Sequence, residues 1–317
     1  MANTVKYYKI TNLRYSTCLS VSGSNLSALT SHKNVVTNTY NNNREQWWRI
    51  SSLGNNVQVK SAVNPLYGLN VYRTGSPYNC DVFPISGNET DAAVNIVYNS
   101  TYGAYMIKLT NYNLYLTASG SGENANVYWG SYTNDHSQYW TLTPLTLSNE
   151  RYMYILTCNI NQKYSSNDTV IKNYGCCVCC ACDVASKYKG SSYTLSQMKS
   201  AGVYTTTDAT CHWGNVPSAY FITITEDSQS EYYHRMKLEL ESDHLVIAHI
   251  TNAAGTSHHY VVVYKYFNYG ESTDGFIVGD PYNSDTTDPK GRYIRLKQAM
   301  EDQGATRICE LIITGNK

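Results

Sequence analysis

The sequence predicts two units of different fold class, an all-β unit in residues 1–148 and an α+β unit in residues 149–317. The chain has 317 residues, and folded domains commonly have about 100–200. Short strand-like runs between Asn, Ser, Gly and Thr turns fill the first part, which is typical of a packed or closed all-β unit. In the second part, helical patterns at 183–188, 230–240 and 296–300 alternate with apolar strand patterns.

Charge and hydropathy argue against a nucleic acid partner and against a membrane span. Lys+Arg and Asp+Glu both number 24, so the formal net charge is zero. Without a basic field to hold a phosphate backbone, we expect no nucleic acid partner. No run reaches the roughly 18–20 apolar residues of a membrane span. The first residues lack a signal-peptide pattern, so we expect either synthesis without a leader or its earlier removal, and secretion stays open.

The all-β unit contains an internal repeat. Six residues recur at one offset of 92 positions (126 − 34), and half of that offset predicts a third copy between the two. Leu69-Asn70-Val71 fits this middle copy loosely, although the copy lacks the Gln and Trp of the other two. The identical pairs are Asn34 and Asn126, Val35 and Val127, Tyr40 and Tyr132, Asn42 and Asn134, Gln46 and Gln138, and Trp48 and Trp140.

Two motifs carry a family resemblance. Gln46-Trp47-Trp48 and Gln138-Tyr139-Trp140 close the outer copies, and Cys18-Leu19-Ser20-Val21 lies upstream of the first. These segments resemble ricin B-type lectins, in which three repeats end in Gln-x-Trp. The resemblance covers roughly residues 5–145 and implies a β-trefoil whose tryptophans pack in the core.

The resemblance also implies a glycan ligand. Lectins of this family hold sugar with an upstream Asp, an aromatic platform and a neighbouring polar residue. The Asp positions here are Ser20, Asn70 and Thr117, so the charge-assisted bond from a carboxylate to a sugar diol is missing. A scaffold or partner-binding role is therefore the alternative, and the middle copy is the poorest candidate. The implied carbohydrate-binding residues are Tyr40, Asn42 and Gln46 in the first copy, and Tyr132, Asn134 and Gln138 in the third.

Three segments of the second unit carry the residues of a thiol hydrolase. Gly175-Cys176 opens a helical pattern, and a thiol at a helix N-terminus lies at the positive end of the helix dipole, which favours the thiolate. A nucleophilic Cys needs a base, and the base needs an orienting group. His259 leads into one apolar strand and Asp280 ends the next, so neighbouring strands could bring them together.

These segments, with Gln162 upstream, resemble papain-like cysteine peptidases, especially the branch that processes bacteriocin leaders. The resemblance implies that Cys176 is the nucleophile, His259 the general base, and Asp280 its orienter. Gln162 and the backbone N–H of Cys176 would form the oxyanion hole. This chemistry requires no cofactor and no metal. By domain order alone, the chain is also similar to a mushroom agglutinin with a papain-like domain.

Several alternatives stay open at the site. Cys177 is a rival nucleophile. Many members of the family have Gly directly after the catalytic Cys, and in this sequence Cys177 stands in that place, which departs from the family pattern. His258 is a rival base, although alternation along a strand points it away from His259. Cys177, Cys180, Ala181 and Val184 share one helical face and are expected to pack in the core. The C-x-x-C pairs in the segment Cys176–Cys182 could instead hold zinc, but second ligands are scarce.

The expected function is a cysteine peptidase or amidase that acts on a peptide or protein substrate through a thioester. Its lectin unit would direct it to glycans or cell surfaces, which suits a toxin or defence role. One alternative is a carbohydrate- or partner-binding lectin whose hydrolase domain is vestigial. Another is an acyltransferase of the transglutaminase type, since these enzymes share the Cys, His, Asp order.

Overall fold

The computed structural model describes residues 7–23, 29–53, 55–145, 151–152, 159–205, 207, 209–267 and 271–317. Contacts between residues divide the chain into Met1–Thr146, called here the trefoil unit, and Leu147–Lys317, called the second unit. The expected boundary at residue 148 lies outside the described residues. None of the described helices is long and apolar enough to cross a membrane.

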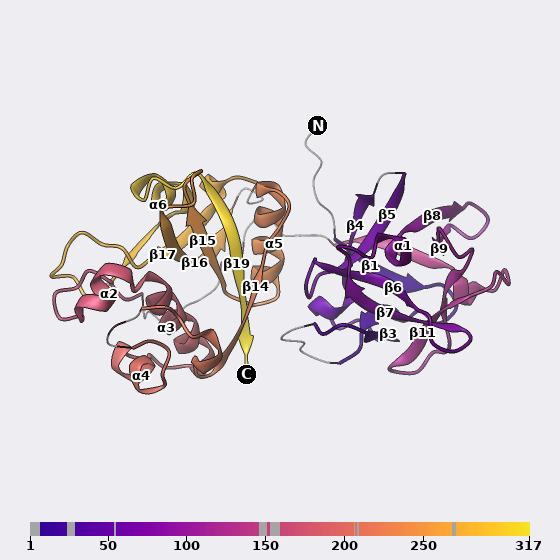
Figure 1. The fold of residues 1–317 in the computed structure, drawn as a ribbon, viewed down its shortest axis with the longest axis horizontal. Helices are drawn as coiled ribbons and strands as arrows, with labels where there is room; N and C mark the ends of the chain where they lie inside the picture. The colour runs from indigo at the N-terminus through magenta and orange to yellow at the C-terminus, as the bar shows by residue number, and fades with distance from the viewer. Residues whose placement is uncertain are drawn as a thin grey trace. The chain divides into compact units, whose positions relative to one another are not determined.

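Six antiparallel strands of the trefoil unit close into a ring in the order β1-β4-β5-β8-β9-β12, with β12 returning to β1. Three hairpins, β2–β3, β6–β7 and β10–β11, complete the three copies, and β3, β7 and β11 pair with one another. The all-β prediction is confirmed as a β-trefoil arrangement (Figure 1). The bounds are β1 Tyr7–Asn12, β2 Cys18–Val21, β3 Lys33–Asn38, β4 Trp47–Leu53, β5 Asn56–Ser61, β6 Tyr67–Tyr72, β7 Tyr78–Pro84, β8 Val94–Asn99, β9 Ala104–Leu109, β10 Tyr115–Ala118, β11 Ala125–Gly130 and β12 Trp140–Pro144, with short helices η1 Arg44–Gln46, α1 Glu89–Ala92 and η2 His136–Gln138.

The tryptophans of the two Gln-x-Trp motifs are buried in equivalent positions. Trp48 Nε1 donates to the carbonyl of Leu19 at 2.9 Å, and Trp140 Nε1 donates to that of Leu116 at 3.0 Å. Each indole therefore ties the last strand of its copy to the second strand while its rings fill the core. Val94 stands at the equivalent position of the middle copy, 46 residues from each tryptophan (94 − 48 and 140 − 94), and is buried in the same core.

Three asparagines, one from each copy, form a closed ring of amide hydrogen bonds. Asn34 Nδ2 donates to Asn126 Oδ1 at 3.0 Å, Asn126 Nδ2 to Asn79 Oδ1 at 3.0 Å, and Asn79 Nδ2 to Asn34 Oδ1 at 2.7 Å. The ring joins β3, β7 and β11 where these strands pair. The repeat predicted the equivalence of Asn34 and Asn126 but not their partner Asn79, because the spacing is 45 on one side (79 − 34) and 47 on the other (126 − 79).

The second unit is built on one antiparallel sheet in the order β14-β19-β15-β16-β17-β18, with β13 added beside β16. Helix α3 packs against β16 and α5 against β19 (Figure 1). Strands and helices alternate as the α+β prediction requires, while the papain-like assignment stays a prediction. The bounds are β13 Arg151–Tyr152, α2 Thr169–Tyr174, α3 Cys176–Lys189, α4 Leu195–Ser200, η3 Trp213–Asn215, β14 Ala219–Ile224, α5 Gln229–Glu241, β15 Val246–Thr251, β16 His258–Tyr266, η5 Thr273–Gly275, β17 Phe276–Asp280, β18 Arg292–Arg295, α6 Leu296–Asp302 and β19 Arg307–Asn316.

Helix α3 is buried on more than one side. Cys180 and Val184 pack into the core formed with the sheet, whereas Cys177 and Ala181 pack into a second cluster. The prediction that these four residues pack in the core is confirmed, and the structure adds that they divide between two clusters. The small side chains of the cysteine-rich segment suit this position, since they allow other elements to approach the helix closely.

Candidate functional site

The loop before α3 places Cys176 at the first position of that helix. Asp168 Oδ1 accepts a hydrogen bond from Ile171 N at 2.9 Å and caps α2, and Gly175 is the single residue between the end of α2 and the start of α3. A Cβ on Gly175 would lie 2.7 Å from both the Cα and the carbonyl O of Ile171. Only glycine allows so close an approach, and it leaves Cys176 at the positive end of the α3 dipole.

The sheet brings the predicted base and its orienting group together. His259 Nε2 lies 2.7 Å from Asp280 Oδ1, and the side chains are 5% and 0% exposed. His258, the rival base, is exposed and lies with its Nδ1 2.9 Å from His249 Nε2. Alternation along β16 thus separates the two histidines onto opposite faces, as the sequence predicts.

Electrostatics favour a charged imidazole at this position. Burial lowers the pKa of His259, but hydrogen bonds with Asp280 and with Cys176 outweigh it and raise the pKa to about 9. Because Nε2 is bonded to Asp280, Nδ1 is the ring nitrogen left to interact with the thiol. Cys176, His259 and Asp280 therefore lie in one chain of contacts that can carry a thiolate–imidazolium pair.

Gln162, the predicted oxyanion-hole residue, lies in the same region. Its backbone N–H donates to Pro281 O at 2.8 Å, which ties it to the residue after Asp280. Its side-chain Nε2 donates to Lys172 O at 3.3 Å, close to the end of α2, and its Oε1 is buried with no hydrogen-bond partner. One amide hydrogen is thus engaged weakly, while the other can still donate to a ligand.

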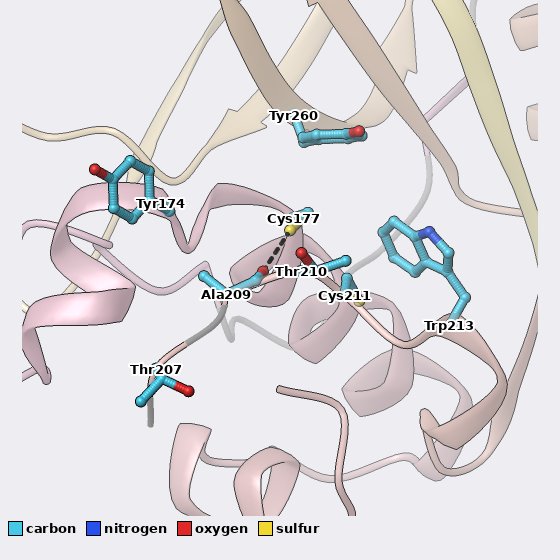
Figure 2. A pocket seen from close by; sticks show the side chains of 8 residues that line it. All are labelled: Tyr174, Cys177, Thr207, Ala209, Thr210, Cys211, Trp213 and Tyr260. Carbon is cyan, nitrogen blue, oxygen red and sulfur yellow. Dashed lines mark hydrogen bonds between the residues drawn. The ribbon is translucent and has the colours of Figure 1, made fainter. Parts of the chain in front are cut away.

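Cys177 faces a different part of the molecule. Its Sγ donates to Ala209 O at 3.3 Å on the rim of a pocket of about 510 Å³ (Figure 2). The aromatic rings of Tyr174, Trp213 and Tyr260 line the same pocket. A hydrogen bond with Cys211 lowers the pKa of Cys177 in spite of its burial. Cys177 therefore remains a candidate nucleophile alongside Cys176.

The first and third trefoil copies repeat one local geometry. Tyr40 Oη donates to Asn42 Oδ1 at 2.6 Å, and Tyr132 Oη donates to Asn134 Oδ1 at 2.9 Å. Both asparagines have a left-handed backbone, with φ of 61° and 55°, which Asn tolerates better than most residues. Each pair presents an aromatic ring beside a planar amide.

The two rings differ in how open they are. Tyr132 is 51% exposed, and its ring centroid lies 5.2 Å from that of Tyr115. The Nζ of Lys9, by contrast, lies over the Tyr40 ring at 4.7 Å from its centroid. The third copy therefore offers the more accessible aromatic surface.

Gln46 and Gln138 are not placed to bind sugar, which corrects the prediction for these two residues. Gln46 Oε1 accepts from Asn41 N and its Nε2 donates to Thr39 O, both at 2.8 Å. Gln138 Oε1 accepts from Thr133 N at 2.9 Å, and its Nε2 donates to Ser131 O at 2.8 Å. The side chains are 0% and 1% exposed, so both amides hold their own loops.

The middle copy, expected to be the poorest, contains a pocket of about 440 Å³. Asn70, at one of the family's Asp positions, donates to Asp81 Oδ1 at 2.6 Å and accepts from Asn88 Nδ2 at 2.6 Å. Sequence reasoning missed both partners. Asn88 could have been found, because it stands 46 positions from both Asn42 and Asn134 (88 − 42 and 134 − 88).

The described part of the chain contains no group of three or more His, Cys, Asp or Glu side chains arranged to hold a metal ion. The cysteines of α3 instead make packing contacts and hydrogen bonds to backbone carbonyls, such as Cys180 Sγ to Tyr260 O at 3.3 Å.

A family model and several solved structures are similar to the trefoil unit. The family described as ricin-type β-trefoil lectin domain-like matches residues 2–79. Among solved structures, the designed three-fold symmetric protein ThreeFoil is 22% identical, covering 44% of this chain and 99% of its own, with a TM-score of 0.40. The Macrolepiota procera ricin B-like lectin in complex with lactose is 19% identical, with coverages of 45% and 98% and a TM-score of 0.38. The Rhizoctonia solani agglutinin is 12% identical, with coverages of 46% and 99% and a TM-score of 0.38. No curated protein matched the chain.

Proposed function

We propose that this protein binds glycans through its trefoil unit and that its second unit is a cysteine hydrolase. The ricin-type family match supports the first half of the proposal. The contact chain from Cys176 through His259 to Asp280 is the single observation that supports the second half.

Glycan binding is assigned first to the third copy, where Tyr132 and Asn134 combine an open aromatic face with an amide. Sugar rings present apolar C–H faces and hydroxyl groups, which such a pair can contact at once. We expect Tyr132→Ala to lower binding on a glycan array about ten-fold or more, since the lost ring contact and hydrogen bond together contribute about 1–3 kcal/mol. Tyr98→Ala, which removes another exposed tyrosine of the same unit, should bind like the unmodified protein. Equal binding by both variants would contradict this assignment.

In the second unit, the Cys176 thiolate attacks the carbonyl carbon of an amide. The backbone N–H of Cys176 and the amide of Gln162 donate to the developing oxyanion. His259 gives its proton to the leaving amine as the C–N bond breaks, which leaves a thioester. His259 then takes a proton from water as the water attacks the thioester, and the acid and the thiolate are released. Asp280 keeps the imidazole in the required tautomer throughout.

Mild alkylation tests the hydrolase half directly. We expect iodoacetamide at about pH 6 to label Cys176 alone and fast, because ordinary thiols with a pKa of ~8.5 are almost wholly protonated there. Peptide mapping by mass spectrometry identifies the labelled residue, and labelling at Cys177 instead would transfer the nucleophile to that residue. Slow labelling spread over the cysteines would support a lectin with a vestigial hydrolase. If Cys176 is reactive, product analysis with an added primary amine separates hydrolysis from acyl transfer.

A further inference from the structure

The carboxylate of Asp280 has two oxygens, and the predicted mechanism uses only one of them. Oδ1 accepts hydrogen bonds from His259 Nε2 at 2.7 Å and from Tyr282 N at 2.8 Å. Oδ2 lies 2.7 Å from Nη2 of Arg292. The Asp280 side chain is 0% exposed, so both of its oxygens depend on donors from the protein. A buried anion of this kind is stable only when its oxygens are paired.

Arg292 is placed for this contact by the sheet and is held there by two further groups. It stands directly opposite Asp280 in the pairing of β18 with β17. Its Nε donates to Tyr282 O at 2.7 Å, and its Nη1 lies 2.7 Å from Asp302 Oδ2 on α6. Each of the three guanidinium nitrogens therefore contacts a different partner. The planar Arg side chain holds these three directions at once, whereas a Lys ammonium cannot hold them in the same way.

We infer that Arg292 is a positioning residue of the proposed hydrolase, which holds the Asp280 carboxylate turned toward His259. This inference rests on the proposed function of the second unit. Without Arg292, Oδ2 would be buried without a donor. The carboxylate would then rotate to find another donor, and this movement weakens its bond to the imidazole. A weaker bond to Asp280 makes protonated His259 less stable, and with it the thiolate of Cys176.

The pH dependence of Cys176 alkylation by iodoacetamide in the full-length protein measures this effect. We expect Arg292→Ala to move the half-maximal rate upward by about one pH unit, which is about a ten-fold slower rate on the acid side. At pH 10, where ordinary thiols are ionised, the rate should match that of the unmodified protein. Arg292→Lys keeps the positive charge but not the planar guanidinium. Its half-maximal rate should therefore fall at a pH between those of the unmodified protein and Arg292→Ala.

Arg295→Ala is the matched control, because Arg295 lies on the same strand and its Nη1 donates to Asp274 O rather than to Asp280. Its pH profile should equal that of the unmodified protein. A merely structural role for Arg292 predicts an altered rate at every pH and no shift of the profile, and that result would overturn the inference. If Arg292→Ala does not fold, an unshifted profile for Arg292→Lys overturns it equally.

The two proposals fail in different ways. If the unmodified protein shows no fast labelling of Cys176 at acid pH, the hydrolase proposal fails and the inference falls with it. If the unmodified protein labels fast and both Arg292 variants keep its pH profile, the hydrolase stands and only the role of Arg292 is wrong.

Discussion

Replacing His259 with alanine is expected to slow the alkylation of Cys176 at pH 6 by about two to three orders of magnitude. The imidazolium that pairs with the thiolate would be absent, and an ordinary thiol with a pKa of ~8.5 is ionised to roughly 0.3% at that pH. The raised pKa of His259 also indicates the pH range over which its proton stabilises the folded protein. The pKa of His259 is raised from 6.5 to about 9, so its proton stabilises the folded state fully below pH 6.5, and this contribution is lost as the pH rises through about 9.

His258→Ala is the control for this experiment. His258 precedes His259 on β16 but contacts His249 on the other face of the strand, so its removal should leave the rate unchanged. The rates of both variants should converge with that of the unmodified protein near pH 10. A His259→Ala variant that still labels fast at pH 6 would show that the helix dipole alone maintains the thiolate, and the proposed base would lose its role.

Replacing Gly175 with alanine is expected to have the second large effect, on both stability and reactivity. The new Cβ would lie 2.7 Å from two backbone atoms of Ile171, so α2 and the start of α3 must move apart. Overpacking of this kind costs about 1–3 kcal/mol. A displacement of about 1 Å at a reacting group can also lower a rate about 100-fold. Pulsed alkylation of the buried Cys182 in urea measures the stability of the second unit, and labelling of Cys176 at pH 6 measures the site.

Gly214→Ala is the matched substitution, because a Cβ at Gly214 meets no atom within 4 Å. Gly214→Ala should change neither the stability of the second unit nor the rate of Cys176 labelling appreciably. If Gly175→Ala behaves in the same way as Gly214→Ala, the tight junction between α2 and α3 is not what places Cys176.

The contact chain of the site could be predicted from order along the chain. A Gly-Cys pair before a helical pattern, a His at the start of one strand and an Asp at the end of the next are local features, and neighbouring strands bring the last two together. Arg292 could not be found in this way. It follows Asp280 after an irregular loop, and only the register of β17 with β18 shows that the two face each other.

The trefoil unit shows the same limit. The repeat of 92 positions predicted the two equivalent outer copies, and the family resemblance implied the core position of Trp48 and Trp140. It could not predict the closing hydrogen bonds of Gln46 and Gln138, because a polar residue beside an aromatic one suits both a sugar site and a tight loop. Loop geometry decides between these roles, and it is not visible in residue types alone.

The ring of Asn34, Asn79 and Asn126 has a consequence for how this chain can change in evolution. Replacing one member leaves a donor on one neighbour and an acceptor on the other without partners, so the remaining two lose their advantage over other polar residues. The three positions are therefore expected to be coupled in their effect on stability, although they are spread over the three copies. The middle copy contributes Asn79 to the ring although it lacks the Gln and Trp of the other two copies, so we expect divergent relatives that replace one of the three asparagines to replace the others as well.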